Sequence, residues 1–231
     1  MKLYRVDLSK AGKELDTVVV IDVIRAFTTT AFAFQSGAER IIVVSEVDEA
    51  FALQRRYRGA LLMGEVKGEP IEGFDYGNSP SALVDVDLTG KTLIHRTSAG
   101  TQGVVKSAAA RKIYATGLCN ARATARAILY DKPGSITLVE TGIRPGGWGD
   151  EDTACADYLQ SLLMELPVDT REIVRRVRES KSAALFRRGQ ESRFPEADLA
   201  LVLEIDRFDF VMKVKSEDHL LFLYKAPSFS G

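Results

Sequence analysis

The stretch TVVVIDVIRAFTTT (residues 17–30) joins a short β-branched run to a polar segment and a run of threonines. A continuous apolar run of this length is typical of a buried strand in a parallel sheet. Similar runs predict further strands at residues 41–44, 60–63, 91–95, 112–115 and 135–140. Stretches of helical period predict helices at residues 28–36, 48–58, 101–110, 120–129, 152–165 and 170–178. Strands that alternate with helices indicate an α/β fold with three layers, α/β/α, around a largely parallel or mixed sheet.

The length of 231 residues is long for one domain and short for two. We expect a single α/β domain over residues 1–231, and the alternative is two lobes at about 1–90 and 91–168 with a C-terminal addition at 169–231. SGAERI at 36–41 resembles AAARKI at 108–113, which favours two pseudo-symmetric halves, although α/β folds repeat strand–helix units by nature. The C-terminal addition is expected to supply helices and antiparallel strands at an edge of the sheet, near residues 211–214 and 220–224.

The composition excludes several classes of protein. Thirty-one basic and 32 acidic residues give a net charge of −1, which argues against nucleic acid as a partner. Apolar runs such as residues 199–203 are far shorter than a membrane span, and the N-terminus lacks the apolar stretch of a secretory signal, so we expect a cytoplasmic protein. With two histidines and two isolated cysteines, any bound metal must be held mainly by oxygen. A homodimer is left open.

Two loops carry the groups that bind anions. In open α/β sheets, ligands bind at the carboxyl ends of the strands, and helix N-termini, hydroxyls and arginine all bind phosphate well. The loop after the first strand contains Arg25, Thr28 and Thr29, and the loop after residues 91–95 contains Arg96, Thr97, Ser98, Gly100 and Thr101. We therefore expect two anion-binding loops. The alternative is that the threonines only cap helices and the two arginines lie on the surface.

Carboxylates follow the same strands. Asp22, Glu65, Asp75 and the acidic triplet at 150–152 all fall at or after expected strand ends. They would repel an anionic ligand unless a cation lay between them, and Mg²⁺ is commonly held by one or two carboxylates together with a phosphate. The alternative for the triplet is that acidic residues at a helix start interact favourably with the helix dipole. The sequence thus predicts Mg²⁺ as the cofactor.

The segment GFDYGNSP (residues 73–80) is rich in turn-forming residues, so it is either a functional loop or a plain turn. The chain has no P-loop, no GxGxxG and no GxSxG sequence. It also has no Asp-x-Asp after its first strand, as a haloacid-dehalogenase-type phosphatase would require. The absent motifs argue against a P-loop or dinucleotide-binding protein, against a serine hydrolase with a GxSxG motif, and against a haloacid-dehalogenase-type phosphatase.

Several of these segments occur together in a known order. VIDVIRAFTT (20–29), GE (64–65), GFDYGNSP (73–80), RTSAGT (96–101) and ED (151–152) resemble the 2-phosphosulfolactate phosphatase family in order and spacing, as does the stretch 198–210. The resemblance implies a three-layer α/β/α fold and a Mg²⁺-dependent acid phosphatase that converts 2-phospho-3-sulfolactate to sulfolactate and phosphate, on a route to coenzyme M. The chain departs from the family pattern at Ala99, where an asparagine amide is usual, and at Phe27, where threonine is usual.

Residue roles follow as hypotheses from the resemblance and the loops together. Asp22, Glu65 and Asp152 would hold Mg²⁺, while a metal-bound water or Asp22 itself attacks phosphorus. Asp75 or Glu151 would be the general acid. Substrate binding is assigned to Arg25, Thr28, Thr29, Asn78, Ser79, Arg96, Thr97, Ser98, Gly100 and Thr101. The competing function is a non-catalytic binder or sensor of small dianionic metabolites.

Overall fold

The computed structural model describes residues 1–13, 16–188 and 191–228. These residues form an α/β fold with one sheet of ten strands in the order β1-β8-β2-β7-β9-β10-β3-β6-β4-β5. The strands are β1 (Lys2–Asp7), β2 (Thr17–Ile21), β3 (Arg40–Val44), β4 (Leu61–Val66), β5 (Glu69–Pro70), β6 (Thr92–Arg96), β7 (Lys112–Thr116), β8 (Ser135–Glu140), β9 (Phe210–Glu217) and β10 (Leu220–Pro227). The helices are α1 (Ala26–Gln35), α2 (Val47–Arg56), α3 (Gly100–Lys106), α4 (Ala121–Asp131), α5 (Asp150–Leu163), α6 (Thr170–Glu179), α7 (Lys181–Arg187) and α8 (Glu196–Val202), with the 3₁₀ helices η1 (Ser81–Leu83) and η2 (Leu118–Asn120).

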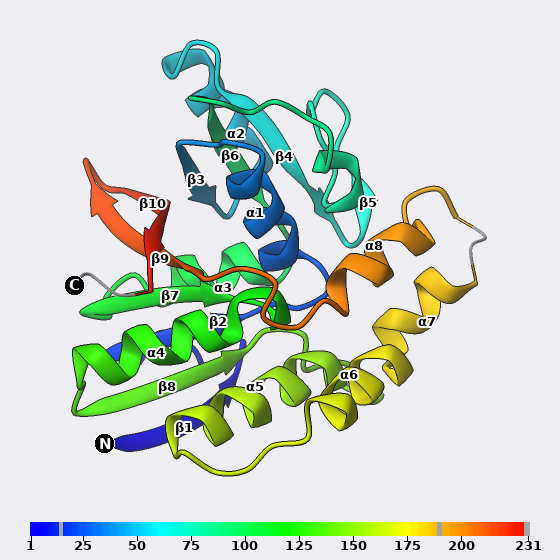
Figure 1. The fold of residues 1–231 in the computed structure, drawn as a ribbon. Coiled ribbons are helices and arrows are strands. Elements are labelled where there is room, and N and C mark those ends of the chain that lie inside the picture. The colour runs from blue at the N-terminus through cyan, green and yellow to red at the C-terminus, as the bar shows by residue number, and fades with distance from the viewer. Residues whose placement is uncertain (14–15, 189–190, 229–231) are drawn as a thin grey trace.

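Two parallel blocks make up the sheet, and a C-terminal hairpin joins them (Figure 1). Strands β1, β8, β2 and β7 are parallel in one block, and β3, β6 and β4 are parallel in the other. The hairpin β9–β10 is antiparallel to both neighbours, β7 and β3. The mixed α/β sheet expected from the sequence is therefore confirmed.

The hairpin is antiparallel as expected, but its expected place at an edge of the sheet is wrong. Val214 pairs with Ile113 of β7, and Phe222 pairs with Ile42 of β3. The physical reason is that the hairpin is apolar on both faces: Val211 belongs to the core on one side of the sheet and Met212 to the core on the other. Strands buried on both faces belong inside a sheet, where helices cover both sides.

The two stretches 1–90 and 91–168 contribute interleaved strands. Strand β2 comes from the first stretch but pairs with β7 and β8 from the second. Strand β6 comes from the second but pairs with β3 and β4 from the first. Each block of the sheet is thus built from both stretches of the chain.

Helices cover the two faces of the sheet. Helices α1 and α3 pack on one face of the sheet. On the opposite face, α4 and α5 cover the block that contains β2, and α2 covers the block that contains β3. All of β2 is buried because its side chains alternate between two cores. Val18 and Val20 face the core with α1, and Val19 and Ile21 face the core with α4 and α5.

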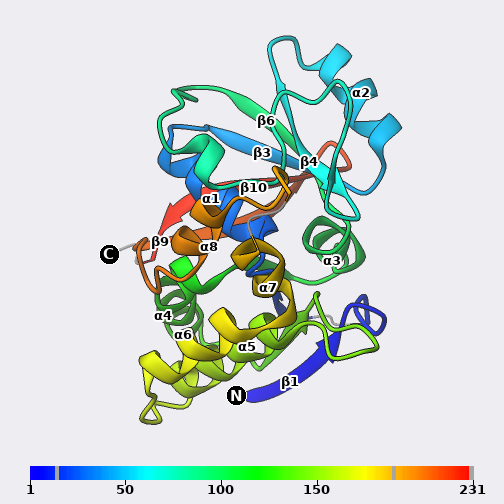
Figure 2. The same ribbon diagram turned by 90° about the vertical axis from the view of Figure 1, so that its right-hand side faces the viewer.

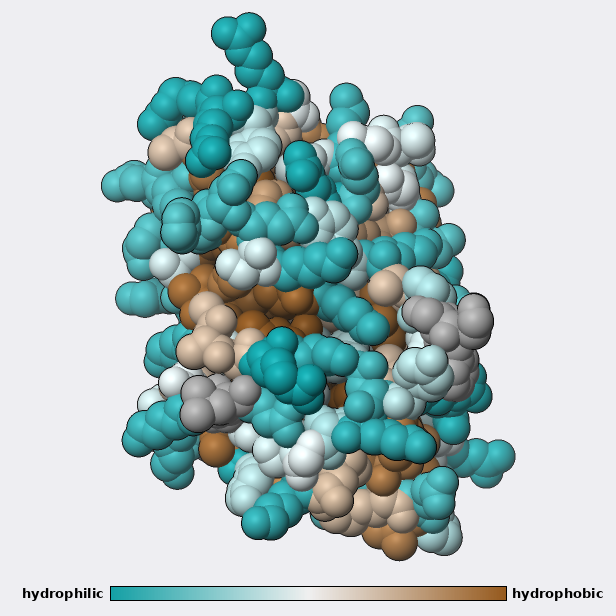
Figure 3. All heavy atoms as spheres, turned by 90° about the vertical axis from the view of Figure 1, so that its left-hand side faces the viewer, coloured by the Kyte–Doolittle hydropathy of each residue, from teal (hydrophilic) through white to brown (hydrophobic). Residues whose placement is uncertain are grey.

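The C-terminal helices lie beside the functional end of the sheet. Helix α6 packs against α5, and α7 and α8 then pass over the carboxyl ends of the strands (Figure 2). The opposite side of the molecule is mostly hydrophilic, with a hydrophobic area near its middle (Figure 3). Among the described residues, no helix combines the length and the hydrophobicity that a bilayer crossing needs.

Candidate active site

A cleft of about 590 Å³ opens at the carboxyl ends of β2, β4, β6 and β8, beneath α7. A smaller pocket of about 340 Å³ adjoins it and shares Arg25, Glu65 and Asn78 with it. Six of the residues expected from the sequence line these two spaces, namely Asp22, Arg25, Glu65, Asn78, Ser79 and Ser98. The polar strand ends thus meet as the sequence predicts, although not every residue named in them reaches the cleft.

Asp22 lies at the N-termini of two helices at once. Its Oδ1 accepts a hydrogen bond at 3.0 Å from the backbone N–H of Ala26, the first residue of α1. The backbone N–H of Gly100, the first residue of α3, also donates to this carboxylate. Burial is the main reason that the pKa of Asp22 is raised to about 6; the charges of Glu65 and Glu151 act in the same direction, and the two N–H groups oppose them. At neutral pH the carboxylate is therefore ionised but poorly solvated.

Asp152 lies behind Asp22 and not in the cleft wall. Its Oδ1 accepts from the N–H of Val23 at 2.9 Å, and its Oδ2 accepts from the N–H of Gly142 at 2.7 Å. Burial, followed by the charges of Asp22 and Glu151, raises the pKa of Asp152 well above its usual value. This residue therefore joins the loop after β2, directly beside Asp22, to the loop after β8.

Glu151 is buried next to the cleft. Its Oε1 accepts a hydrogen bond at 2.6 Å from the hydroxyl of Ser182, which does line the cleft, and its Oε2 has no hydrogen-bond partner. Burial raises the pKa of Glu151, and the Ser182 hydroxyl opposes this. A buried carboxylate with one unpaired oxygen is costly in the charged form, so the protonated form is favoured more than for a solvated glutamate.

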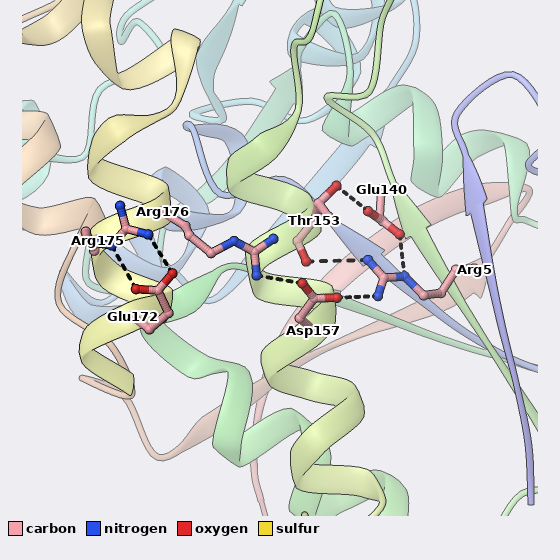
Figure 4. Close-up of polar contacts among 7 residues, drawn as sticks. All are labelled: Arg5, Glu140, Thr153, Asp157, Glu172, Arg175 and Arg176. Carbon is pink, nitrogen blue, oxygen red and sulfur yellow. Dashed lines mark hydrogen bonds and ion pairs between the residues drawn. The ribbon is translucent and has the colours of Figure 1, made fainter. Parts of the chain in front are cut away.

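Helix α5 carries both acidic residues and is firmly anchored. Asp157 of α5 pairs with Arg5 of β1 at 2.5 Å and with Arg176 of α6 at 2.6 Å, and Arg5 also pairs with Glu140 at 2.7 Å (Figure 4). None of these four residues lines the cleft. The network fixes the helix that positions Glu151 and Asp152.

Glu65 connects two loops at the edge of the cleft. Its Oε1 accepts from the N–H of Ser98 at 2.6 Å, and its Oε2 accepts from the N–H of Gly68 and from the Ser98 hydroxyl. The turn after β4 is thereby tied to the loop after β6. Because Glu65 lines the cleft, these hydrogen bonds also fix a carboxylate at its surface.

The first expected anion-binding loop is only partly present. Thr28 is fully buried and its hydroxyl donates to the carbonyl of Val23 at 2.8 Å, while Thr29 is fully buried with an unpartnered hydroxyl. The structure therefore does not place these two threonines in the cleft, because almost the whole of α1 is covered by its neighbours. Arg25 does line the cleft, but it is buried and not a surface residue.

Capping explains most of the second expected loop. The N–H of Thr101 donates to the Thr97 hydroxyl at 3.0 Å, and the N–H of Thr97 donates to the Thr101 hydroxyl at 2.8 Å. Arg96 donates to the carbonyls of Ser45 and Glu65 and does not line the cleft. Of the residues expected to bind substrate in this loop, Ser98 lines the cleft, next to Ala99. Gly100 contributes its backbone N–H and a close approach, since a Cβ at this position would lie 2.8 Å from Asp22 Oδ2.

The loop at 73–80 divides into a structural and a cleft-facing part. Asp75 accepts from the N–H of Leu62 at 2.7 Å and does not line the cleft, so its expected catalytic role does not fit its position. Asn78 is buried in the cleft wall, and its Oδ1 has no hydrogen-bond partner. Ser79 donates to Asp198 at 2.7 Å.

Three basic residues that the site hypotheses did not name line the cleft, namely Lys67, Lys106 and Arg144. None of them forms an ion pair with an acidic side chain of the described residues. Their positive charges therefore remain available to an anionic ligand. Arg144 follows β8 in the sequence, and this position after a strand end could have identified it as a candidate ligand-binding residue.

A Mg²⁺ ion fits the charge of the site but not the expected set of three ligands. Among the described residues, no three His, Cys, Asp or Glu side chains form a group ready to hold a metal. Asp152 does not line the cleft, unlike the other two expected ligands, Asp22 and Glu65. Asp22 and Glu65 remain at the cleft surface, and two carboxylates completed by waters and a phosphate are a common Mg²⁺ arrangement.

Comparisons with known proteins show the family of the chain. A family model described as 2-phosphosulpholactate phosphatase matches residues 4–217. A probable 2-phosphosulfolactate phosphatase of Bacillus subtilis is 36% identical over 203 residues, covering 87% of this chain and 88% of its own. A probable 2-phosphosulfolactate phosphatase of Carboxydothermus hydrogenoformans is 43% identical over 148 residues, covering 64% of this chain and 60% of its own.

The fold and the comparisons together define the class of protein as a phosphoric monoester hydrolase. The chain belongs to the 2-phosphosulpholactate phosphatase family. The family resemblance seen in the sequence is thereby confirmed, and of the two functions left open there, the enzyme is favoured over the non-catalytic binder.

Proposed function

We propose that the protein hydrolyses a small phosphate monoester that carries a second anionic group, 2-phosphosulfolactate or a related phosphorylated hydroxy acid, with Mg²⁺ as cofactor. The observation that carries the proposal is the position of Asp22, a buried carboxylate at two helix N-termini in a cleft with unpaired basic residues. The names of the relatives support the same substrate.

Mg²⁺ would be held by Asp22 and Glu65. When bound, the metal would neutralise charge on the phosphoryl oxygens and lower the pKa of a bound water. Asp152 keeps Asp22 in place through Val23 and Gly142 and is not itself assigned as a ligand. The ionised state of Asp22 at neutral pH also suits the alternative in which this carboxylate is the nucleophile.

Glu151 is the better of the two expected general acids. Burial raises its pKa, which favours the protonated form that a general acid needs. The Ser182 hydroxyl lies between Glu151 and the cleft. When Glu151 is protonated it can donate to Ser182, so that Ser182 gives its own proton to the leaving alkoxide and takes the proton of Glu151 in its place. Asp75 lacks such a connection because its carboxylate holds the backbone of Leu62.

Hydrolysis of a panel of phosphorylated hydroxy acids, with Mg²⁺ and with a chelator, tests the proposal. We expect phosphate release from 2-phosphosulfolactate that stops with chelator and returns with Mg²⁺, and that is lost in Asp22→Asn. Asp157→Asn is the matched control, since it removes a half-buried carboxylate outside the cleft. Substrate binding without any turnover in the wild type would instead support a non-catalytic binder.

The nucleophile is decided by a separate experiment. Rapid mixing with ³²P-labelled substrate, followed by acid quenching, would trap labelled protein if Asp22 attacks phosphorus, and would leave the protein unlabelled if water attacks.

A cytoplasmic location belongs to the same proposal, and the free thiols of Cys119 and Cys155 are in keeping with a reducing compartment. A role in coenzyme M formation, a homodimer and the absence of nucleic-acid binding stay predictions from the sequence.

A further inference from the structure

Arg25 is held by a residue from the far end of the chain. Asp198 of α8 accepts a hydrogen bond from Arg25 Nη1 at 2.6 Å, and its side chain is fully buried. The same Nη1 donates to the carbonyl of Arg193 at 2.9 Å. The guanidinium also lies against the rings of Phe186 and Phe194, with Cζ 4.9 Å and 5.4 Å from their centroids. Carboxylate and rings together fix the orientation of this group.

Asp198 is itself fixed by the loop at 73–80 and by η1. Its Oδ1 accepts from the hydroxyl of Ser79 at 2.7 Å, and from the N–H of Ser81 at 3.0 Å and its hydroxyl at 2.5 Å. The carboxylate thus uses one oxygen for the serines and the other for Arg25. So many donors around one buried charge satisfy it without further partners.

Only one edge of the Arg25 guanidinium is used by these contacts. Arg25 lines both the cleft and the adjoining pocket, next to Glu65 and Asn78. The hydrogen bonds that the Arg25 side chain makes to the described residues come from Nη1, and the side chain lines both spaces. An arginine with one edge tied down and the other at a cleft can bind two oxygens of a phosphate at once.

We propose that Asp198 is a positioning residue that holds Arg25 so that its free edge binds the phosphate group of the substrate. This inference rests on the proposed function for its substrate and adds to it the residue that orients the phosphate-binding arginine. It also makes the segment that carries α7 and α8 part of the active site, because Phe186, Phe194 and Asp198 all come from it.

Steady-state kinetics of Asp198→Asn and Arg25→Ala, with the double variant, test the proposal. We expect each single variant to lower kcat/KM by about tenfold or more, as loss of a charged hydrogen bond does. The double variant should equal Arg25→Ala, because Asp198 acts through Arg25. If the loss of kcat/KM in the double variant equals the product of the losses in the two single variants, the proposal is overturned. That result would mean that Asp198 acts independently of Arg25, as in a merely structural role.

Asp157→Asn is the control for loss of a half-buried carboxylate in an ion-pair network away from the cleft (Figure 4). We expect it to lower the unfolding temperature without raising the KM. Asp198→Glu keeps the charge and should restore part of the lost kcat/KM. If Asp198→Asn does not fold, Ser81→Ala is tested in its place, because it removes one hydrogen-bond donor to Asp198. Ser81→Ala should raise the KM by a larger factor than it lowers kcat. An unchanged KM in Ser81→Ala would then count against the proposal.

Binding of inorganic phosphate, measured by calorimetry on the full chain, separates this inference from the proposed function. If the wild type hydrolyses no phosphate monoester but Asp198→Asn weakens phosphate binding about tenfold, the inference holds and the proposed function fails. If the wild type is active and Asp198→Asn binds phosphate as tightly as the wild type, the inference fails and the proposed function stands.

Discussion

Asp22 and Gly100 lie so close together that the glycine has no room for a side chain. A Cβ at Gly100 would lie 2.8 Å from Asp22 Oδ2 and 2.7 Å from the Cβ of Ala26. The contact puts the start of α3 directly on the carboxylate. The glycine of the RTSAGT segment is therefore required by Asp22 and not by a turn.

We predict that Gly100→Ala lowers kcat by about 100-fold, because the methyl group displaces Asp22 from its position at the two helix ends. Phosphatase assays at saturating substrate and Mg²⁺ measure this. Gly134→Ala is the control, since its Cβ would meet nothing nearer than Asp16 Oδ2 at 3.4 Å. Equal kcat in the two variants would refute the prediction.

We predict that Asp22→Asn changes the pH dependence of stability. The pKa of Asp22 rises from 3.8 in the unfolded chain to about 6 in the folded protein, so the wild type loses stability as the pH rises from about 4 to about 6. Asparagine carries no such charge. Between pH 4 and pH 8, the free energy of unfolding of the variant should therefore rise relative to that of the wild type by up to about 3 kcal/mol. Urea unfolding with chelator present gives the difference, and a difference that does not vary with pH would contradict the prediction.

We predict that Glu151→Gln lowers kcat most for substrates whose leaving group is a strong base and must be protonated as it departs. The kcat for 2-phosphosulfolactate should fall by about 100-fold, and that for p-nitrophenyl phosphate much less. The fall in kcat with rising pH, which the wild type should show as Glu151 ionises, should disappear. Similar losses with both substrates would argue against a general acid.

We predict that Asp75→Ala changes stability and not catalysis. The variant leaves the N–H of Leu62 without its acceptor, which should lower the free energy of unfolding by about 1 kcal/mol. The activity per folded molecule should stay within about twofold of the wild type because Asp75 does not reach the cleft. A large loss of kcat would restore Asp75 as a catalytic residue.

We predict that Lys106→Gln and Arg144→Gln raise the KM for substrates with a second anionic group. Each change removes an unpaired positive charge from the cleft, so the KM should rise several-fold and less so at high salt. The KM for p-nitrophenyl phosphate, which lacks the second anion, should change less. Arg58→Gln, in a different pocket, is the control for loss of surface charge. Equal changes for both substrates would show that these residues do not read the second anion.

The sequence predicts the strands that are buried on both faces well, because their apolar runs are local. Strands β2 and β8 occupy the expected residues 17–21 and 135–140. The polar strand at Lys2–Asp7 is missed because it has no such run. The hairpin is misplaced because its neighbours, β7 and β3, are chosen by tertiary packing far along the chain.

The sequence predicts which residues line the cleft where this depends on position at a strand end, as for Asp22 and Glu65. The sequence does not predict which residues line the cleft where this depends on which face of a helix is covered. Thr28 and Thr29 have side chains that suit an anion, but their helix, α1, is buried. The pairing of Arg25 with Asp198 cannot be read from spacing, because 173 residues separate them. Only the family resemblance of the stretch 198–210 pointed there.

The position of the β9–β10 hairpin has a consequence during synthesis. Until residues 210–227 have left the ribosome, β7 and β3 each present an open, apolar edge, and no strand fills the gap between the two parallel blocks. From the synthesis of β7 until the hairpin emerges, the nascent chain therefore has two exposed strands that can pair wrongly with each other or with other chains, and we expect chaperones to bind it in that interval.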